Sequence, residues 1–152
     1  MNISLDTLKK LREETSAGVS DCRQALEDAE GDYVKAKKLI QERSIEKAAK
    51  KEGKETSEGI VASYVHANGK VGVLVALTCE TDFVALNEEF KKLGHEVALQ
   101  IAAMDPKDVS ELLKSAYIRD GKTTIADLVK TTIAKVGENI TISRFSRLAL
   151  GE

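Results

Sequence analysis

The sequence is poor in the residues that define several protein classes. Its 152 residues include no tryptophan, one proline and two cysteines. Cys22 and Cys79 are too few and too far apart for a disulfide framework, so we expect two buried thiols. Neither cysteine stands at a metal-ligand spacing from the other, or from the two histidines, His66 and His95. No metal site is therefore predicted.

Charge imbalance and long apolar runs are also missing. The formal net charge is -2 at pH 7, which gives no sequence-wide reason to bind nucleic acid or anionic lipid. The longest apolar run, residues 71–79, is far too short to span a bilayer. The first residues, MNISLDTLKK, have the pattern of neither a secretory signal nor a transit peptide. We expect a cytoplasmic protein that contacts neither membrane nor nucleic acid.

The first third of the chain predicts three short helices. Ser4 is a good N-cap for the first, which we expect to end at Gly18 in the left-handed conformation. A second helix begins at residues 20–21, and Asp32 caps a third. The residues expected on their inner faces are Leu5, Leu8, Leu11, Cys22, Ala25, Leu26, Ala29, Tyr33, Ala36, Leu39 and Ile40. The predicted bundle, residues 1–45, is small and should be only marginally stable alone.

A charged stretch follows, EKAAKKEGKETSEG, which has no aromatic and no large apolar residue. We interpret residues 46–58 as a solvated helix end and a flexible linker. A nucleic-acid-binding arm is the alternative, but the interleaved glutamates would weaken its attraction to phosphate. A domain boundary is therefore predicted here, with a second domain at residues 59–152.

Beyond this boundary the pattern changes to strands. The segments IVASYVH and KVGVLVALTC flank Asn68-Gly69, a strong signal for a tight hairpin turn. The second segment is apolar on both faces in its middle, so we place it at the centre of a sheet. Near the C-terminus, NITISRFSRLAL predicts a third strand, with Ile140 and Ile142 on one face.

Helices are predicted between the second and third strands. A long one ends at Asp105-Pro106, because proline cannot continue a helix. Its apolar face consists of Phe90, Leu93, Val97 and Ile101. Two more are expected at residues 109–117 and 125–136, the last ending at Gly137. The fold class is therefore α+β: an N-terminal three-helix bundle, then a three-stranded antiparallel sheet covered by helices.

The stretch TCETDFVALNEEF allows two interpretations. In the first, Thr81 or Asp82 caps the long helix, and Phe83, seven residues before Phe90, extends its buried face. In the second, the helix begins at Asn87, and Phe83 projects from a loop at the end of the strand. The pattern alone does not decide between them.

A thiol enzyme is a further hypothesis for the same region. Cys79 lies beside Glu80 and Asp82, with His66 on the neighbouring predicted strand. However, adjacent acids raise the pKa of a thiol, and neither a glycine-rich phosphate loop nor an H-E-x-x-H motif accompanies it. We therefore expect that the protein is not an enzyme.

Four motifs resemble one known family. LKKLREETSAGVSDCRQALEDAEGDYVKA, IEKAAKK, CETDFVA and IAKVGENI occur in the order and at the separations found in bacterial elongation factor Ts. The whole chain is similar to a short form of that family. The resemblance implies a guanine-nucleotide exchange factor without a cofactor. Its partner would be elongation factor Tu, GDP-bound or nucleotide-free, from which it promotes GDP release so that GTP can bind.

The resemblance also implies two sets of contact residues. One set would reach the partner near the Mg²⁺ of its nucleotide and disturb that ion: Thr81, Asp82, Phe83 and Val84. The other lies in the N-terminal bundle, which resembles a ubiquitin-associated (UBA-like) module, and would dock through the turn between its first two helices: Leu11, Arg12, Val19 and Asp21.

The chain departs from the family pattern at several points. Ser16 stands where glycine is usual, and Ser20 where a larger apolar residue is common. Longer members duplicate the core and insert a helical hairpin, whereas this chain has only the short stretch 105–122 there. The resemblance therefore implies a homodimer through the core sheet, without a disulfide at Ser146. The main alternative function is a protein-binding adaptor that uses the UBA-like module.

Overall fold

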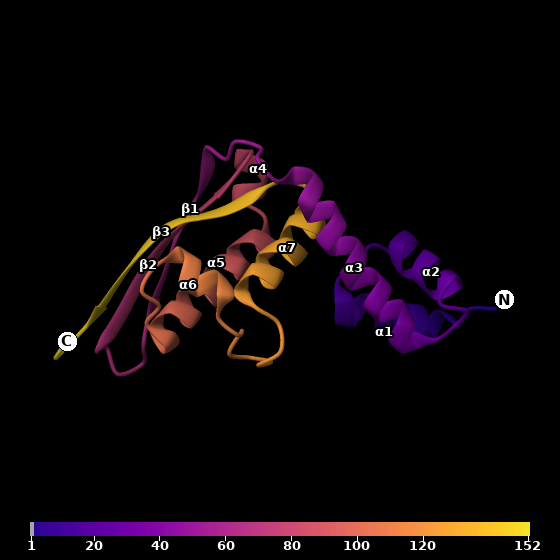
Figure 1. Cartoon of the computed structure of the whole chain (residues 1–152), viewed down its shortest axis with the longest axis horizontal. Helices are drawn as coiled ribbons and strands as arrows, with labels where there is room; N and C mark the ends of the chain where they lie inside the picture. Colours follow the sequence, from indigo (N-terminus) through magenta and orange to yellow (C-terminus); the bar gives the residue numbers. More distant parts are fainter. Residues whose placement is uncertain (1) are drawn as a thin grey trace.

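A computed structural model describes residues 2–152. The elements are α1 (Leu5–Thr15), α2 (Val19–Asp28), α3 (Tyr33–Lys51), β1 (Glu58–Val65), β2 (Val71–Cys79), α4 (Asp82–Ala85), α5 (Glu88–Met104), α6 (Val109–Lys114), α7 (Ile125–Val136) and β3 (Ile140–Ala149). Figure 1 shows an elongated molecule with α1 and α2 at one end, the sheet at the other and α3 between them. The predicted α+β class is confirmed.

The sheet is antiparallel and has the strand order β1-β2-β3. The predicted central place of the second strand is therefore confirmed. At the hairpin turn Gly69 has φ 72°, and its N–H donates to the carbonyl of His66 at 2.7 Å. Along β2, Val75 is fully buried whereas its neighbour Leu74 is 55% exposed. The sheet thus packs one face against helices and leaves the other open (Figure 1).

Buried apolar residues form two separate clusters. The N-terminal cluster contains Leu8, Leu11, Cys22, Ala25, Leu26, Ala29, Ala36 and Ile40. The second lies between the sheet and α5, α6 and α7. Helix α3 contributes to both, because Ala36 and Ile40 belong to the first cluster and Ala48 to the second. Residues 46–51 form the helix end that the sequence suggested, but Ala48 packs into the second cluster, so this end is not wholly solvated. Alanine, lysine and glutamate favour helix, and Ala48 gains burial by continuing it.

Helix α1 ends earlier than expected. Its C-cap is Ser16, with φ 55° and ψ 16°, and the N–H of Ser16 donates to the carbonyl of Arg12 at 2.7 Å. Gly18 instead precedes α2 as its N-cap, with φ -62°. The prediction that Gly18 adopts the left-handed conformation is therefore wrong. Leu5, expected inside, is the first residue of α1 and is 70% exposed.

The helices between β2 and β3 follow the predicted pattern closely. The four residues of the predicted apolar face of α5 are all buried. Asp105 and Gly137 end α5 and α7 in the left-handed conformation. Helix α6 ends at Lys114, short of the expected Tyr117. The reason is tertiary: the Gln100 side chain of α5 donates to the carbonyl of Ala116 at 2.9 Å and accepts from the N–H of Ile118 at 3.0 Å. Within residues 2–152, no helix is long and apolar enough to cross a membrane.

Candidate functional site

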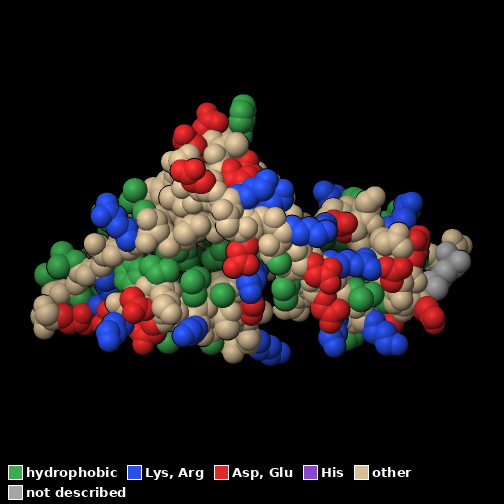
Figure 2. All heavy atoms as spheres, turned by 45° about the horizontal axis from the view of Figure 1, so that its top comes forward, with side chains coloured by type: hydrophobic (Ala, Val, Ile, Leu, Met, Phe, Trp, Pro, Cys, Tyr) green, Lys and Arg blue, Asp and Glu red, His purple; other side chains and the backbone are tan. Residues whose placement is uncertain are grey.

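An exposed aromatic ring marks the corner between β2 and α5. We call residues Thr81–Leu86 the α4 corner. Phe83 is 84% exposed and Leu86 is 69% exposed. Figure 1 places α4 at the apex of the molecule, and Figure 2 shows hydrophobic atoms protruding there above a group of acidic side chains. Large apolar side chains in such positions commonly mark contact sites for other proteins.

Each of the two interpretations of this stretch was partly right. Thr81 does cap a helix: its Oγ1 accepts from the N–H of Val84 at 3.4 Å. That helix is the separate four-residue α4. Asn87 caps the long helix, and its Oδ1 accepts from the N–H of Glu89 at 2.8 Å. Phe83 therefore does not extend the buried face of α5; it projects, as in the second interpretation.

One side of α4 is anchored in the core, which leaves the opposite side exposed to solvent. Val84 and Ala85 are buried, at 9% and 6% exposure, and belong to the cluster under the sheet. Phe83 and Leu86 are three residues apart and therefore share the opposite side of this single turn. Leu86 was missed by the sequence analysis. Its spacing from Phe83 would have indicated it, once a short helix was assumed.

Glu138 holds the start of the α4 corner. Its carboxylate accepts two hydrogen bonds from Thr81, one from the N–H at 2.9 Å and one from Oγ1 at 2.7 Å. The carbonyl of Thr81 accepts from Sγ of Cys79 at 3.1 Å and from the N–H of Ala85 at 3.2 Å. The backbone is therefore fixed on both sides of the residue that precedes the exposed ring.

Cys79 has the environment of a structural thiol. Its side chain is fully buried, as expected. Burial raises the pKa of this thiol, and the nearby charge of Glu138 raises it further. A nucleophilic cysteine requires the opposite shift. Cys79 thus acts as a hydrogen-bond donor within the corner, and the thiol-enzyme hypothesis gains no support. Among the described residues, no group of three or more potential metal ligands is present.

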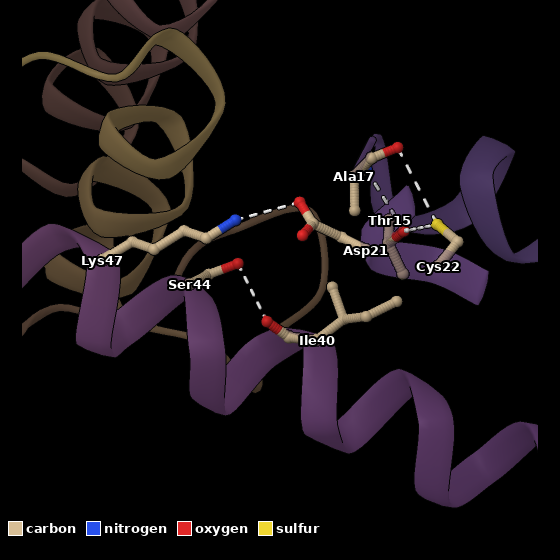
Figure 3. Close-up of polar contacts among 7 residues, drawn as sticks. All are labelled: Thr15, Ala17, Asp21, Cys22, Ile40, Ser44 and Lys47. Carbon is tan, nitrogen blue, oxygen red and sulfur yellow. Dashed lines mark hydrogen bonds and ion pairs between the residues drawn. The ribbon is translucent and has the colours of Figure 1, made fainter. Parts of the chain in front are cut away.

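The predicted contacts of the N-terminal module differ in accessibility. Arg12 is exposed and Val19 is 44% exposed, so both are open to a partner. Leu11 is fully buried in the N-terminal cluster. Asp21 forms an ion pair with Lys47 of α3 at 2.9 Å (Figure 3). Leu11 therefore supports the turn between α1 and α2 from within, whereas Asp21, with a side chain that is 49% exposed, is partly open to a partner.

That turn is held by a buried cysteine. Sγ of Cys22 donates to the carbonyl of Ala17 at 3.8 Å and lies 3.9 Å from Oγ1 of Thr15 (Figure 3). Ser16, which lies between Thr15 and Ala17 in the sequence, is exposed and adopts the left-handed conformation. This position favours glycine, because glycine adopts φ near 55° without the steric cost that serine incurs.

The two sets of predicted contact residues form separate patches. Figure 1 shows the α1–α2 turn within the N-terminal bundle and α4 at the apex beyond the end of α3. The structure does not bring them together into a single cavity. A partner that contacts both must therefore be large.

Comparison with known proteins gives a consistent result. The family model described as "Elongation factor TS" matches residues 80–152. A protein named "Elongation factor Ts" from Fervidobacterium nodosum is 40% identical over 197 aligned positions, which include 100% of each chain. Relatives of the same name from Leptospira biflexa and Thermotoga neapolitana are 42% and 40% identical, and the matches cover 99% or more of every chain.

The relatives differ from this chain in length more than in pattern. Because the chain has 152 residues, 45 of the 197 positions aligned with the Fervidobacterium protein hold no residue of it. The similarity nevertheless spans the N-terminal helices, the α4 corner and the final strand, since all of the chain is aligned. The chain belongs to the elongation factor Ts family of translation elongation factors.

Proposed function

We propose that this protein is a guanine-nucleotide exchange factor that binds elongation factor Tu and promotes release of its GDP. The observation that carries the proposal is the 84% exposure of Phe83. A benzyl ring held in water is unfavourable by about 1.5–3 kcal/mol relative to burial. Val84 and Thr81 anchor the corner that carries this ring. A partner that buries the ring would therefore gain this free energy of burial.

The proposed mechanism is mechanical. The ring of Phe83 inserts between packed elements of the partner, which shift as units because protein interiors are close-packed. Mg²⁺ requires near-ideal octahedral coordination, so a small shift of the elements that carry its ligands weakens it and the nucleotide with it. Asp82, exposed beside the ring, accepts hydrogen bonds from the partner, and Leu86 adds apolar contact. Thr81 and Val84 hold the corner in place.

Linkage converts this contact into exchange. A factor that binds the nucleotide-free partner more tightly than the GDP-bound partner lowers the affinity for GDP by the same ratio. A hundredfold effect needs about 2.7 kcal/mol of differential binding. Burial of one aromatic ring has that scale. No covalent bond changes, so the proposal needs no acid, base or nucleophile.

The N-terminal module supplies docking in this proposal. Arg12 and Val19 are the contacts that its surface offers directly. Leu11 supports the same surface from within, and Asp21, whose side chain is 49% exposed, pairs with Lys47 beside it. This part of the contact adds affinity for both nucleotide states of the partner, whereas the α4 corner discriminates between them.

A homodimer through the open sheet face completes the proposal. The exposed apolar residues of this face are Val61, Val65, Leu74 and Leu148. Between them lie small residues: the register pairs Ser63 with Leu74, Val65 with Gly72, and Leu74 with Ser146. Arg144, opposite Ala76, adds one charged side chain to this face. The apolar part of the face suits a second copy of itself related by a two-fold axis. Ser146 on this face offers no thiol for an interchain disulfide.

The central test is the rate at which a fluorescent GDP analogue leaves elongation factor Tu. The wild-type chain should accelerate release, and Phe83→Ala should lose most of that acceleration, on the order of a hundredfold. Its thermal midpoint should change little, because the ring is exposed. Val34→Ala is the matched control: Val34 is 77% exposed near the start of α3, and its replacement should leave the rate unchanged. No acceleration by the wild type would refute the proposal.

A further inference from the structure

The exposed ring depends on a contact between two distant parts of the chain. Thr81 donates both its N–H and its hydroxyl to the carboxylate of Glu138, a residue 57 positions later. Two parallel hydrogen bonds to one carboxylate fix direction as well as distance. The same hydroxyl oxygen of Thr81 then caps α4 through the N–H of Val84. A chain of contacts thus links Glu138 to the turn that carries Phe83.

The position of Glu138 is set by the end of α7. Gly137 adopts the left-handed conformation there, with φ 75°, and β3 begins at Ile140. The tight reversal directs Glu138 toward the end of β2, where Thr81 lies. Among the described residues, Glu138 forms no ion pair with lysine or arginine. The hydrogen bonds of its carboxylate among the described residues are the two from Thr81.

We infer that Glu138 is a positioning residue for nucleotide exchange, which acts by holding the α4 corner so that Phe83 points in one direction. The inference rests on the proposed exchange function. A single turn such as α4 has few backbone hydrogen bonds of its own. Without Glu138 the ring remains exposed but loses its fixed orientation. The corner must then be ordered during the displacement of GDP, after docking by the N-terminal module, and part of the free energy that drives displacement is lost.

The neighbouring residue provides a matched control. Nδ2 of Asn139 donates to the carbonyl of Lys54 at 2.8 Å, just beyond α3. It belongs to the same turn after α7 but does not touch the α4 corner. If substitutions acted by loosening the turn as a whole, replacing either residue would lower the exchange rate. If Glu138 acts by positioning the α4 corner, only its replacement would do so.

The experiment compares Glu138→Ala, Glu138→Gln and Asn139→Ala in the full chain, by release of a fluorescent GDP analogue from elongation factor Tu. The maximal rate at saturating factor should fall on the order of tenfold for Glu138→Ala. It should fall less for Glu138→Gln, which keeps an acceptor oxygen for the N–H of Thr81. Asn139→Ala should keep the wild-type maximal rate. The concentration for half-maximal rate should stay within about twofold throughout, because docking by the N-terminal module is intact.

A double mutant separates positioning from folding. If Glu138 acts through the ring, Glu138→Ala should have no further effect in a Phe83→Ala background, because coupled residues are non-additive. Amide hydrogen exchange of Val84 and Ala85 in the free protein should also become faster in Glu138→Ala, without any partner present. A wild-type chain that does not accelerate release overturns both proposals. A wild type that does, with Glu138→Ala equal to it or additive with Phe83→Ala, overturns this inference alone.

Discussion

The two regions proposed to contact the partner are built in opposite ways. In the N-terminal module, two of the predicted contacts also interact within the chain: Leu11 is fully buried, and Asp21 forms a surface ion pair with Lys47. At the α4 corner the roles are divided between neighbours, because Val84 is buried while Phe83 is exposed. At the corner, one residue stabilises the fold and its neighbour is free to contact a partner. In the module, the same residues are proposed to do both. Substitutions in the module should therefore change stability and binding together, whereas those at the tip of the corner should change function alone.

The largest test of this contrast is Leu11→Ala. Removing a fully buried leucine from a cluster this small should lower the free energy of unfolding by about 2–5 kcal/mol. In release assays the concentration of factor for half-maximal rate should rise, while the maximal rate set by the corner should persist. Chemical denaturation followed by circular dichroism measures the first effect. Leu5→Ala, in the same helix but 70% exposed, is the control, and an equal loss there would contradict the burial argument.

A charge on the open sheet face should break the proposed dimer. Leu148 is 75% exposed and lies opposite Gly72 on β2. Leu148→Glu should convert dimers to monomers in sedimentation velocity, because each copy would place an unpaired charge in the apolar contact. Val34→Glu, at an exposed apolar residue of α3, should leave the mass unchanged. A monomeric wild-type chain at micromolar concentration would count against the dimer.

Acid sensitivity should also differ between the two halves. Burial by itself would raise the pKa of Glu96, but hydrogen bonds from Arg119 and Tyr117 outweigh it and hold the pKa below the ordinary value of 4.5. Stability from this carboxylate is therefore present above pH 4.5 and is lost as the pH falls through the lower folded value. The wild type should lose its advantage over Glu96→Gln across that range in urea titrations.

The N-terminal module offers the comparison for this titration. A hydrogen bond from Lys37 also lowers the pKa of Glu14, but Glu14 is exposed. Water screens such a surface pair, so the stability difference between wild type and Glu14→Gln should depend much less on pH. A pH dependence equal to that of Glu96→Gln would show that burial is not the deciding factor.

The smallest expected effect is at the left-handed end of α1. Ser16→Gly should raise the free energy of unfolding by up to about 1 kcal/mol, since relief of the steric cost exceeds the added freedom of the unfolded chain. Ser20→Gly, inside the first turn of α2, should lower it instead. Thermal denaturation distinguishes the two signs. Neither serine takes part in the α4 corner, so the maximal release rate should not change in either variant. This separates the stability of the module from the function of the corner.

Much of the fold could be predicted from local patterns. The spacing of Phe90, Leu93, Val97 and Ile101 indicated one buried face of α5, and the signal at Asn68-Gly69 indicated the hairpin. These features are readable because helical and strand periodicity and turn chemistry act over a few residues. The end of α1 was placed at the wrong residue for a related reason. Both Ser16 and Gly18 are compatible with a helix end, and packing around Cys22 selected the first.

The candidate site was only partly accessible from the sequence. The residues Thr81 to Val84 were identified by resemblance to a family, while the pattern left Phe83 undecided between core and surface. Leu86 and Glu138 were not identified at all. The contact between Thr81 and Glu138 depends on how the end of α7 meets the end of β2, and no local pattern encodes that distance.

The sequence by itself determined which segments become helices and strands, because each carries its own caps, turns and apolar spacing. Only the tertiary structure decided that the single turn α4 and the separate long helix α5 replace one continuous helix at residues 82–104, that Ala48 joins α3 to the second cluster, and that Phe83 faces solvent. These outcomes depend on which surfaces meet after the elements form. Burial of Val84 and the two hydrogen bonds to Glu138 exist only in the assembled fold, and they direct the neighbouring ring outward.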